Sequence, residues 1–299
     1  MVAGWGSTRV VVGVDGSPGG RAALEWAMAD AARREARLLV VSAFPVEVFW
    51  ADPNLIDDRR ITAAGADTEA RVTALVDAVA AESGAWVPVD ILVLPGPASH
   101  HVLAAAEGAD LLVVGSRGRG AVKSALLGSV ALHAVTHARF PVVVVHPAAR
   151  TPAAAARVVV GLDGSDASRV ALEWALDEAG RLGAEVTAVA AYSPASYWSD
   201  VYEIIIPSPE QLRQDAQRGA EAMVSEASPA VPVRATALEG PAGEVLVAAA
   251  EDADLLVAGG RGHGAIRGML LGSVALHCVV HAFGPVVVVP VGSSGAAVE

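Results

Sequence analysis

The feature that most constrains this chain is an internal duplication. The segment RVVVGVDGS that begins at Arg9 returns as RVVVGLDGS at Arg157, and GADLLVVGSRGRG returns later as DADLLVAGGRGHG. Asp163 follows Asp15 by 148 positions, and later matches lie 144 positions apart, so the two copies differ only in loop lengths. A repeat of this size within 299 residues predicts two domains of the same fold.

The domain boundaries follow from the repeat. Residues 1–147 and 157–292 are expected to form the two domains. Residues 148–156 are expected to be a linker, because this segment is rich in Pro and Ala and has no apolar period. Residues 293–299 are left as a tail.

Each copy alternates short runs rich in Val and Leu with helical patterns. Runs that are apolar throughout indicate strands buried on both faces, and hence a parallel sheet covered by helices. The sequence therefore predicts an α/β fold with two tandem, doubly wound domains of five strands each. In the first copy the expected strands are 10–14, 38–43, 87–93, 111–114 and 142–145, and the expected helices are about 18–35, 59–83, 98–107 and 128–138.

A glycine-rich loop follows the fourth expected strand of each copy. The first loop has Gly115 and Gly118, then nine residues, then Gly128 and Ser129, and the second copy repeats this spacing. Glycines let the backbone approach a ligand, and successive amide groups in such a loop form an anion-binding nest. The helix that follows also offers free N–H groups to an anion. The pattern predicts a phosphate-binding loop in each domain.

Charge supports this prediction. The chain carries a net charge of −12, which disfavours nucleic acid as a partner. Positive residues nevertheless gather in the two loops, and neither loop contains an acidic residue; the positive residues are Arg117, Arg119, Lys123, Arg261 and Arg267.

Two common nucleotide motifs are excluded: Val122, not Gly, precedes Lys123-Ser124, so no Walker A loop is present, and no G-x-G-x-x-G follows the first strand.

Cysteine content and hydropathy indicate where in the cell this protein is expected. Cys278 is the only cysteine, which excludes an intrachain disulfide and a thiolate cluster and suggests a buried structural thiol. The N-terminal residues show no secretory signal. The uncharged stretch 268–298 is interrupted by His277, His281 and Gly284, so it is interpreted as soluble core and not as a membrane span. We therefore expect a cytoplasmic protein without a membrane partner.

The combination of G-x2-G-x9-G-[ST] after a strand, V-G-V-D-G-S at the first strand and a closing P-V-V-V-V strand resembles the universal stress protein family. The resemblance covers nearly the whole chain, twice. It implies a Rossmann-like domain of the adenine nucleotide alpha hydrolase-like type, with strand order 3-2-1-4-5. It also implies one bound ATP per domain, with Mg²⁺ as a metal carried by the nucleotide.

The same resemblance assigns site residues. Asp15 and Asp163 would face the ribose, the phosphates or Mg²⁺, with Gly13 and Gly161 beside them. Ala43 and Ala191, at the end of the second strand, would meet adenine through main-chain groups. The remaining cofactor-binding residues would be Gly115, Ser116, Arg117, Gly118, Arg119, Gly120, Gly128, Ser129 and Val130 in the first copy, and Gly259, Gly260, Arg261, Gly262, His263, Gly264, Gly272, Ser273 and Val274 in the second. His263 replaces Arg119, so a weaker second site is expected.

Several of these residues also have structural interpretations. Asp15 can simply initiate a turn, with Ser17 capping a helix that begins at Pro18. The histidine pairs at i, i+4, namely His133 with His137 and His277 with His281, are more typical of packing than of a zinc site. Trp26 and Trp174 are expected in the core. Phe49, Trp50, Tyr197, Trp198 and Tyr202 lie in long loops that could contact a ligand or a partner.

Three functions remain open from the sequence. The leading hypothesis is an ATP-binding stress regulator without strong catalysis, because no G-x-S-x-G elbow or paired base and nucleophile is found. The alternatives are a slow ATPase or phosphotransferase, in which Asp15 and Asp163 hold Mg²⁺ and Ser124 or Ser129 receives phosphate, and an interaction module that needs no nucleotide. The last strands are candidate pairing edges, so a homodimer is expected.

Overall fold

The computed structural model describes residues 8–45, 58–84, 86–118, 127–147, 156–193, 208–262 and 271–291. The chain divides into two compact units, Met1–Pro147 and Ala148–Glu299, which are called the first and second units below. In each unit, parallel strands alternate with helices along the chain.

The elements of the first unit, in chain order, are β1 (Arg9–Gly13), α1 (Pro18–Arg33), β2 (Arg37–Phe44), α2 (Asp58–Ser83), β3 (Val89–Pro95), α3 (Ala98–Ala105), β4 (Leu111–Gly115), α4 (Ser129–His137) and β5 (Val142–Val145). Those of the second unit are β6 (Arg157–Leu162), α5 (Asp166–Leu182), β7 (Glu185–Tyr192), α6 (Pro209–Ala227), β8 (Val233–Glu239), α7 (Ala242–Ala249), β9 (Leu255–Gly259), α8 (Ser273–His281) and β10 (Val286–Val289).

The strand order is β3-β2-β1-β4-β5 in the first unit and β8-β7-β6-β9-β10 in the second. Each of these neighbouring pairs is parallel. The predicted order 3-2-1-4-5 is therefore confirmed in both units. The direction of winding reverses between β1 and β4, and between β6 and β9, and ligands of doubly wound folds bind beyond the strand ends at such a point.

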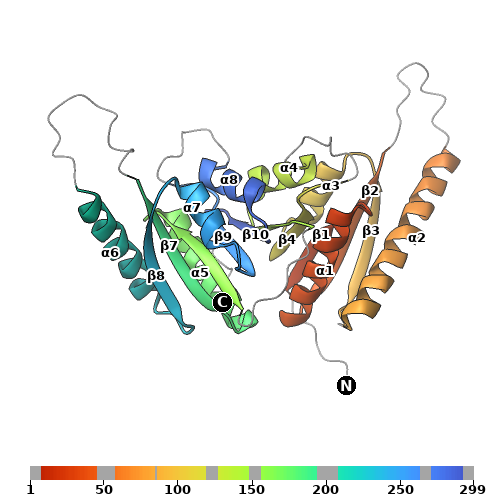
Figure 1. Cartoon of the computed structure of the whole chain (residues 1–299). Coiled ribbons are helices and arrows are strands. Elements are labelled where there is room, and N and C mark those ends of the chain that lie inside the picture. The colour runs from red at the N-terminus through yellow and green to blue at the C-terminus, as the bar shows by residue number, and fades with distance from the viewer. Residues whose placement is uncertain are drawn as a thin grey trace, which may run out of the picture. The chain divides into compact units, whose positions relative to one another are not determined.

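Helices cover both faces of each sheet. In the first unit α1 packs beside α2 on one face, and α3 packs beside α4 on the other (Figure 1). The central strands are enclosed between these layers, and Val10, Val11 and Val12 of β1 have no exposed surface. This burial explains why the strands are apolar without alternation.

The helix starts follow from local capping. The Ser17 hydroxyl accepts a hydrogen bond from the amide of Gly20 at 3.0 Å, and Pro18 occupies the first helical turn of α1. In the second unit Ser165 caps α5 through the amide of Ser168 at 3.2 Å. The capping interpretation of Ser17 and Pro18 is thus confirmed, and it fixes where each first helix begins relative to the strand before it.

The largest boundary error concerns β3, which was expected at 87–93 and runs from Val89 to Pro95. Its register against β2 pairs Val89 with Leu38 and Pro95 with Phe44. Pairing with the neighbouring strand, which local sequence does not encode, decides where this strand begins and ends.

The tryptophans were expected in the core, but Trp26 and Trp174 are only half-buried. The buried face of α1 consists instead of smaller residues such as Leu24, Ala27 and Met28. Cys278 is fully buried on α8, as expected, and burial raises the pKa of its thiol to about 12. Across the described part of the chain, no helix has both the length and the apolar character needed to span a membrane.

The first helix of each unit packs against the end of the fourth strand at a distance that admits only glycine. A Cβ placed on Gly115 would lie 2.5 Å from the carbonyl oxygen of Gly19 in α1, and one on Gly259 would lie 2.9 Å from the carbonyl carbon of Ala167 in α5. Backbone atoms cannot rotate away from such a contact. These glycines therefore hold a helix against a strand, which is a packing role in addition to any role in ligand approach.

We predict opposite effects for two Gly→Ala substitutions in the second unit. Gly259→Ala should lower the free energy of unfolding by about 1–3 kcal/mol, because the added methyl group overpacks backbone atoms. Gly219→Ala in α6, where no atom lies within 4 Å of the added Cβ, should raise it by about 0.5–1 kcal/mol. Denaturant titration of both variants tests the comparison, and equal effects would contradict the packing role.

Candidate functional site

The first component of the site is the Asp-Gly-Ser turn at the end of the first strand. The Oδ1 atom of Asp15 accepts a hydrogen bond from the amide of Ser17 at 2.9 Å. In the second unit, Oδ1 of Asp163 accepts from the amide of Ser165 at 3.0 Å and from its hydroxyl at 2.5 Å. The glycine between them has a φ of 73° in the first unit and 83° in the second. One carboxylate oxygen therefore shapes the turn, as the structural interpretation expected.

The other carboxylate oxygen faces the glycine-rich loop. A Cβ built on Gly118 would lie 2.5 Å from Oδ2 of Asp15, and a Cβ on Gly262 would collide with Oδ2 of Asp163. The ends of β1 and β4, which are about 100 residues apart in the sequence, thus meet at the point where the winding reverses. The turn and the loop form one surface, in which a carboxylate lies against bare backbone.

The second component is the start of α4 and α8. Their N-cap residues are Gly128 and Gly272, and neither helix start has a side-chain cap. The amides of the first turn of a helix have no intrahelical acceptor, so a start of this kind favours an anion. Ser129 and Ser273 are exposed first residues of these helices. The helix start and the glycine-rich loop line the same cavity in each unit.

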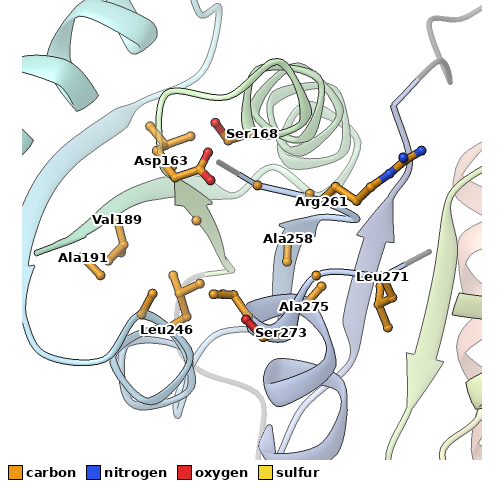
Figure 2. Close-up of a pocket in the computed structure, with 17 residues that line it drawn as sticks. Asp163, Ser168, Val189, Ala191, Leu246, Ala258, Arg261, Leu271, Ser273 and Ala275 are labelled. Atoms are coloured by element: carbon orange, nitrogen blue, oxygen red, sulfur yellow. The ribbon is translucent and has the colours of Figure 1, made fainter. Parts of the chain in front are cut away.

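In the second unit these elements enclose a cavity of about 360 Å³ (Figure 2). Asp163 and Ser168 lie near each other on one side of it, and Leu246, Ser273 and Ala275 lie on another. Its lining also includes Val189 and Ala191 from the end of β7. The surface is mostly apolar with a few polar groups, which is typical of small-molecule sites.

The corresponding cavity of the first unit has a volume of about 560 Å³. Predicted residues of the turn, the loop and the helix start line it: Gly13, Asp15, Gly115, Arg117, Gly118, Gly128, Ser129 and Val130. Those of the second cavity are Gly161, Asp163, Ala191, Gly259, Arg261, Gly262, Gly272, Ser273 and Val274. The structure therefore brings most of the predicted residues together in each unit.

Three predicted residues lie elsewhere. Ser116 and Gly260 are buried behind the loops and are not part of either lining. The amide of Ser116 donates to Val145 at 2.8 Å, while its carbonyl accepts from Gly128 at 2.8 Å, and Gly260 bonds in the same way in the second unit. These residues tie the loop to the sheet and to the helix start. Ala43 does not line the first cavity.

Other predicted residues fall outside the described part of the chain. They are Arg119, Gly120, Lys123, Ser124, His263, Gly264 and Arg267 of the glycine-rich loops, and Phe49, Trp50, Tyr197, Trp198 and Tyr202 of the long loops. Two arginines of the glycine-rich loops, Arg117 and Arg261, lie in the described part of the chain, and both are exposed and line the cavities. Figure 2 shows the Arg261 side chain extending away from Asp163.

Sequence reasoning predicted the helix after the third strand but missed its contribution to the cavity lining. Val102 of α3 and Leu246 of α7 line the cavities, and each touches a predicted glycine: a Cβ on Gly13 would lie 3.2 Å from Val102, and one on Gly161 would lie 2.7 Å from Leu246. It also missed Ser168, on the first turn of α5. The repeat itself offered a signal for Ser168: the first copy has Gly20 at the matching position, so the two copies differ there.

The fold and the site together define a class: doubly wound α/β units, each with a glycine-lined cavity and an uncapped helix start at the carboxyl edge of the sheet. Comparison with known proteins then identifies the family. The sequence profile of the Universal stress protein family matches residues 6–146 and 155–290. The chain belongs to this family.

Relatives of similar length support this assignment. The chain is 37% identical to universal stress protein Rv2005c of Mycobacterium tuberculosis over 290 residues, which cover 91% of this chain and 93% of the relative. It is 31% identical to universal stress protein Rv2623 of the same organism, with 96% and 98% covered. The crystal structure of a universal stress protein from Archaeoglobus fulgidus aligns with a TM-score of 0.66 and 19% identity over 96% of this chain and 97% of that one, which shows a shared fold.

The histidine pairs lie on α4 and α8, directly after the helix starts of the site. The ring centroids of His133 and His137 are 4.2 Å apart, and those of His277 and His281 are 4.4 Å apart. The Nδ1 atom of His137 also lies 3.0 Å from the carbonyl oxygen of His133. Within the described ranges, no group of three or more His, Cys, Asp or Glu side chains is arranged to hold a metal ion.

We predict that acidification destabilises the first unit through His133. Burial lowers the pKa of this imidazole, and the charges of His137 and His100 lower it further. The unfolded chain therefore binds a proton at a higher pH than the folded chain does. The contribution of His133 to the free energy of unfolding is fully present above its ordinary pKa of about 6.5. This contribution is lost as the pH falls toward the lower pKa of His133 in the folded chain.

The measurement is denaturant unfolding between pH 7.5 and 5. His133→Gln should reduce the loss of stability over this range, because it removes the titrating group. An unchanged pH dependence in this variant would contradict the assignment to His133.

Proposed function

We propose that this protein binds one ATP in each unit and acts as a nucleotide-dependent stress regulator without strong catalysis. One observation carries the proposal: in both units a turn, a glycine-rich loop and an uncapped helix start line one cavity beyond the strand ends. Bare backbone and free amides suit a polyphosphate, because they approach it closely and donate hydrogen bonds without a catalytic group.

The remaining surfaces fit the other parts of a nucleotide. Apolar residues such as Val102 and Leu246 offer a wall for a base, and the carboxylates of Asp15 and Asp163 can accept hydrogen bonds from ribose hydroxyl groups. Each described lining contains a single carboxylate. A Mg²⁺ ion would therefore take most of its ligands from phosphate oxygens and water, as this ion commonly does. When bound, it would neutralise phosphate charge beside the aspartate.

The chemistry of the described lining residues argues for binding over catalysis. Their ionisable groups are one aspartate and one arginine in each unit, with no histidine, lysine or cysteine among them. In addition, Oδ1 of each aspartate is engaged by the turn. This oxygen would have to give up its hydrogen bond in the turn before it could take a proton from a serine hydroxyl.

The proposal predicts that ATP binding depends on the two loop glycines. The double variant Gly118→Leu and Gly262→Leu should retain no nucleotide, because each new side chain would occupy the space beside Asp15 or Asp163. The parent chain should bind ATP with roughly micromolar affinity, about −8 kcal/mol. Calorimetry with ATP and mass analysis of small molecules released on denaturation are the measurements.

Gly219→Leu is the matched control, since a Cβ at this position meets nothing within 4 Å. It should keep the affinity of the parent. Far-UV circular dichroism must show that the double variant is folded. A folded double variant that holds ATP as firmly as the parent would refute the proposal.

The rival hypothesis, a slow ATPase or phosphotransferase, predicts steady ADP release that Asp15→Asn together with Asp163→Asn abolishes. Our proposal predicts that the parent accumulates no ADP beyond that of a buffer control, while the Asn variants change ATP affinity or its dependence on Mg²⁺. The cytoplasmic location and the homodimer expected from the sequence stay predictions, and sedimentation of the purified chain tests the second.

A further inference from the structure

The two cavities are lined by corresponding residues, but each also extends to residues that the other does not include. Fifteen lining positions of one cavity correspond to those of the other through the repeat. The second cavity continues to Val189 and Ala191 at the end of β7. The first includes neither of the matching described residues, Val41 and Ala43, and continues instead along α4 to Leu132. Among the described residues, Val189 and Ala191 at the end of β7 therefore line the second cavity, whereas their counterparts at the end of β2 are not part of the first lining.

The shared positions differ in one polar residue. Ser168 lines the second cavity, whereas Gly20, which has no side chain, occupies the matching position in the first. Ser168 is 4% exposed, and its hydroxyl donates a hydrogen bond to the carbonyl oxygen of Ser165 at 2.9 Å. Its proton is thus committed, while its oxygen can still accept. It lies beside the carboxylate of Asp163 (Figure 2), so two acceptors stand together.

The apolar wall also differs. Leu162 and Leu246 of the second cavity replace Val14 and Val102 of the first, while Ala258 replaces Val114. The second cavity, which has the two leucines, has the smaller volume, about 360 Å³ against about 560 Å³ for the first. A smaller apolar space that ends at a strand edge suits a planar base better than a larger one does, because more of the base loses contact with water.

We infer that the two sites bind ATP with different selectivity: the second unit recognises the nucleoside part of the ligand more strongly, through Ser168, Asp163 and the end of β7, whereas the first unit draws most of its affinity from the polyphosphate. Two neighbouring acceptors match the two donor hydroxyl groups of a ribose, and among the described lining residues of the first unit Asp15 alone has a side-chain acceptor in this place. The inference rests on the proposed nucleotide binding. It is separate from the expectation that His263 weakens phosphate binding in the second unit, because it concerns the other end of the ligand.

The test uses the full chain with one site blocked at a time. Gly118→Leu leaves the second site to be measured, and Gly262→Leu leaves the first. ATP and inorganic tripolyphosphate are titrated into each variant by calorimetry. The second site should bind ATP at least tenfold more tightly than tripolyphosphate, and the first should bind the two within about threefold; a tenfold ratio corresponds to about 1.4 kcal/mol.

Two further variants test the named residues. In the chain that carries Gly118→Leu, Ser168→Ala should weaken ATP binding roughly fivefold to tenfold, the worth of about one hydrogen bond, and leave tripolyphosphate binding unchanged. Ala191→Phe should likewise weaken ATP binding alone, because the ring closes the base end of the cavity. Its matched control, Ala43→Phe in the chain that carries Gly262→Leu, should change neither affinity by more than twofold. Should Ala191→Phe prove unfolded by circular dichroism, Ser168→Ala decides.

The outcomes separate the two proposals. Equal discrimination between ATP and tripolyphosphate at both sites, or no effect of Ser168→Ala, would overturn the inference while nucleotide binding itself stands. A parent chain that binds neither compound at either site would overturn the proposed function, and the inference with it.

Discussion

The structure depends on one close contact, which occurs in both units: the backbone at the start of the first helix touches the last residue of the fourth strand. A side chain at Gly115 or Gly259 would overlap that backbone. Because the two elements meet there, the Asp-Gly-Ser turn that leads into the helix lies directly against the glycine-rich loop that follows the strand. The cavity, its carboxylate and its backbone amides all take their positions from this contact, which makes the site a product of packing.

The fold could be predicted from the sequence because its strongest signals are local or repeated. Apolar runs such as Val142–Val145 have only one stable environment, a strand enclosed on both faces, and the duplication lets each half confirm the other. The limits of β3 could not be predicted, since its register depends on contacts with β2 that are remote in sequence. The half-buried Trp26 shows the same limit: residue type predicts an average burial, but the geometry of the helix decides how much of a large ring is covered.

The candidate site could be predicted in outline. Glycine spacing indicated the loop, and the family resemblance indicated Asp15 and Asp163, which the structure places beside it. The exact lining was less accessible. Ser116 has the sequence position of a ligand-facing residue, yet its amide and carbonyl complete the sheet and the helix start. Ser168 stands at a position where the first copy has glycine, so motif comparison passes over it. Differences between the copies thus carried information that their similarity concealed.

The burial of Cys278 has a consequence for the oxidation chemistry open to this chain. The chain has no second cysteine, and this one is fully enclosed on α8 with a pKa near 12, so almost none of it exists as thiolate at neutral pH. Peroxides and disulfides react with the thiolate form at accessible positions. Cysteine-based redox sensing is therefore closed to the folded chain, and oxidising buffers should neither crosslink nor inactivate it by that route.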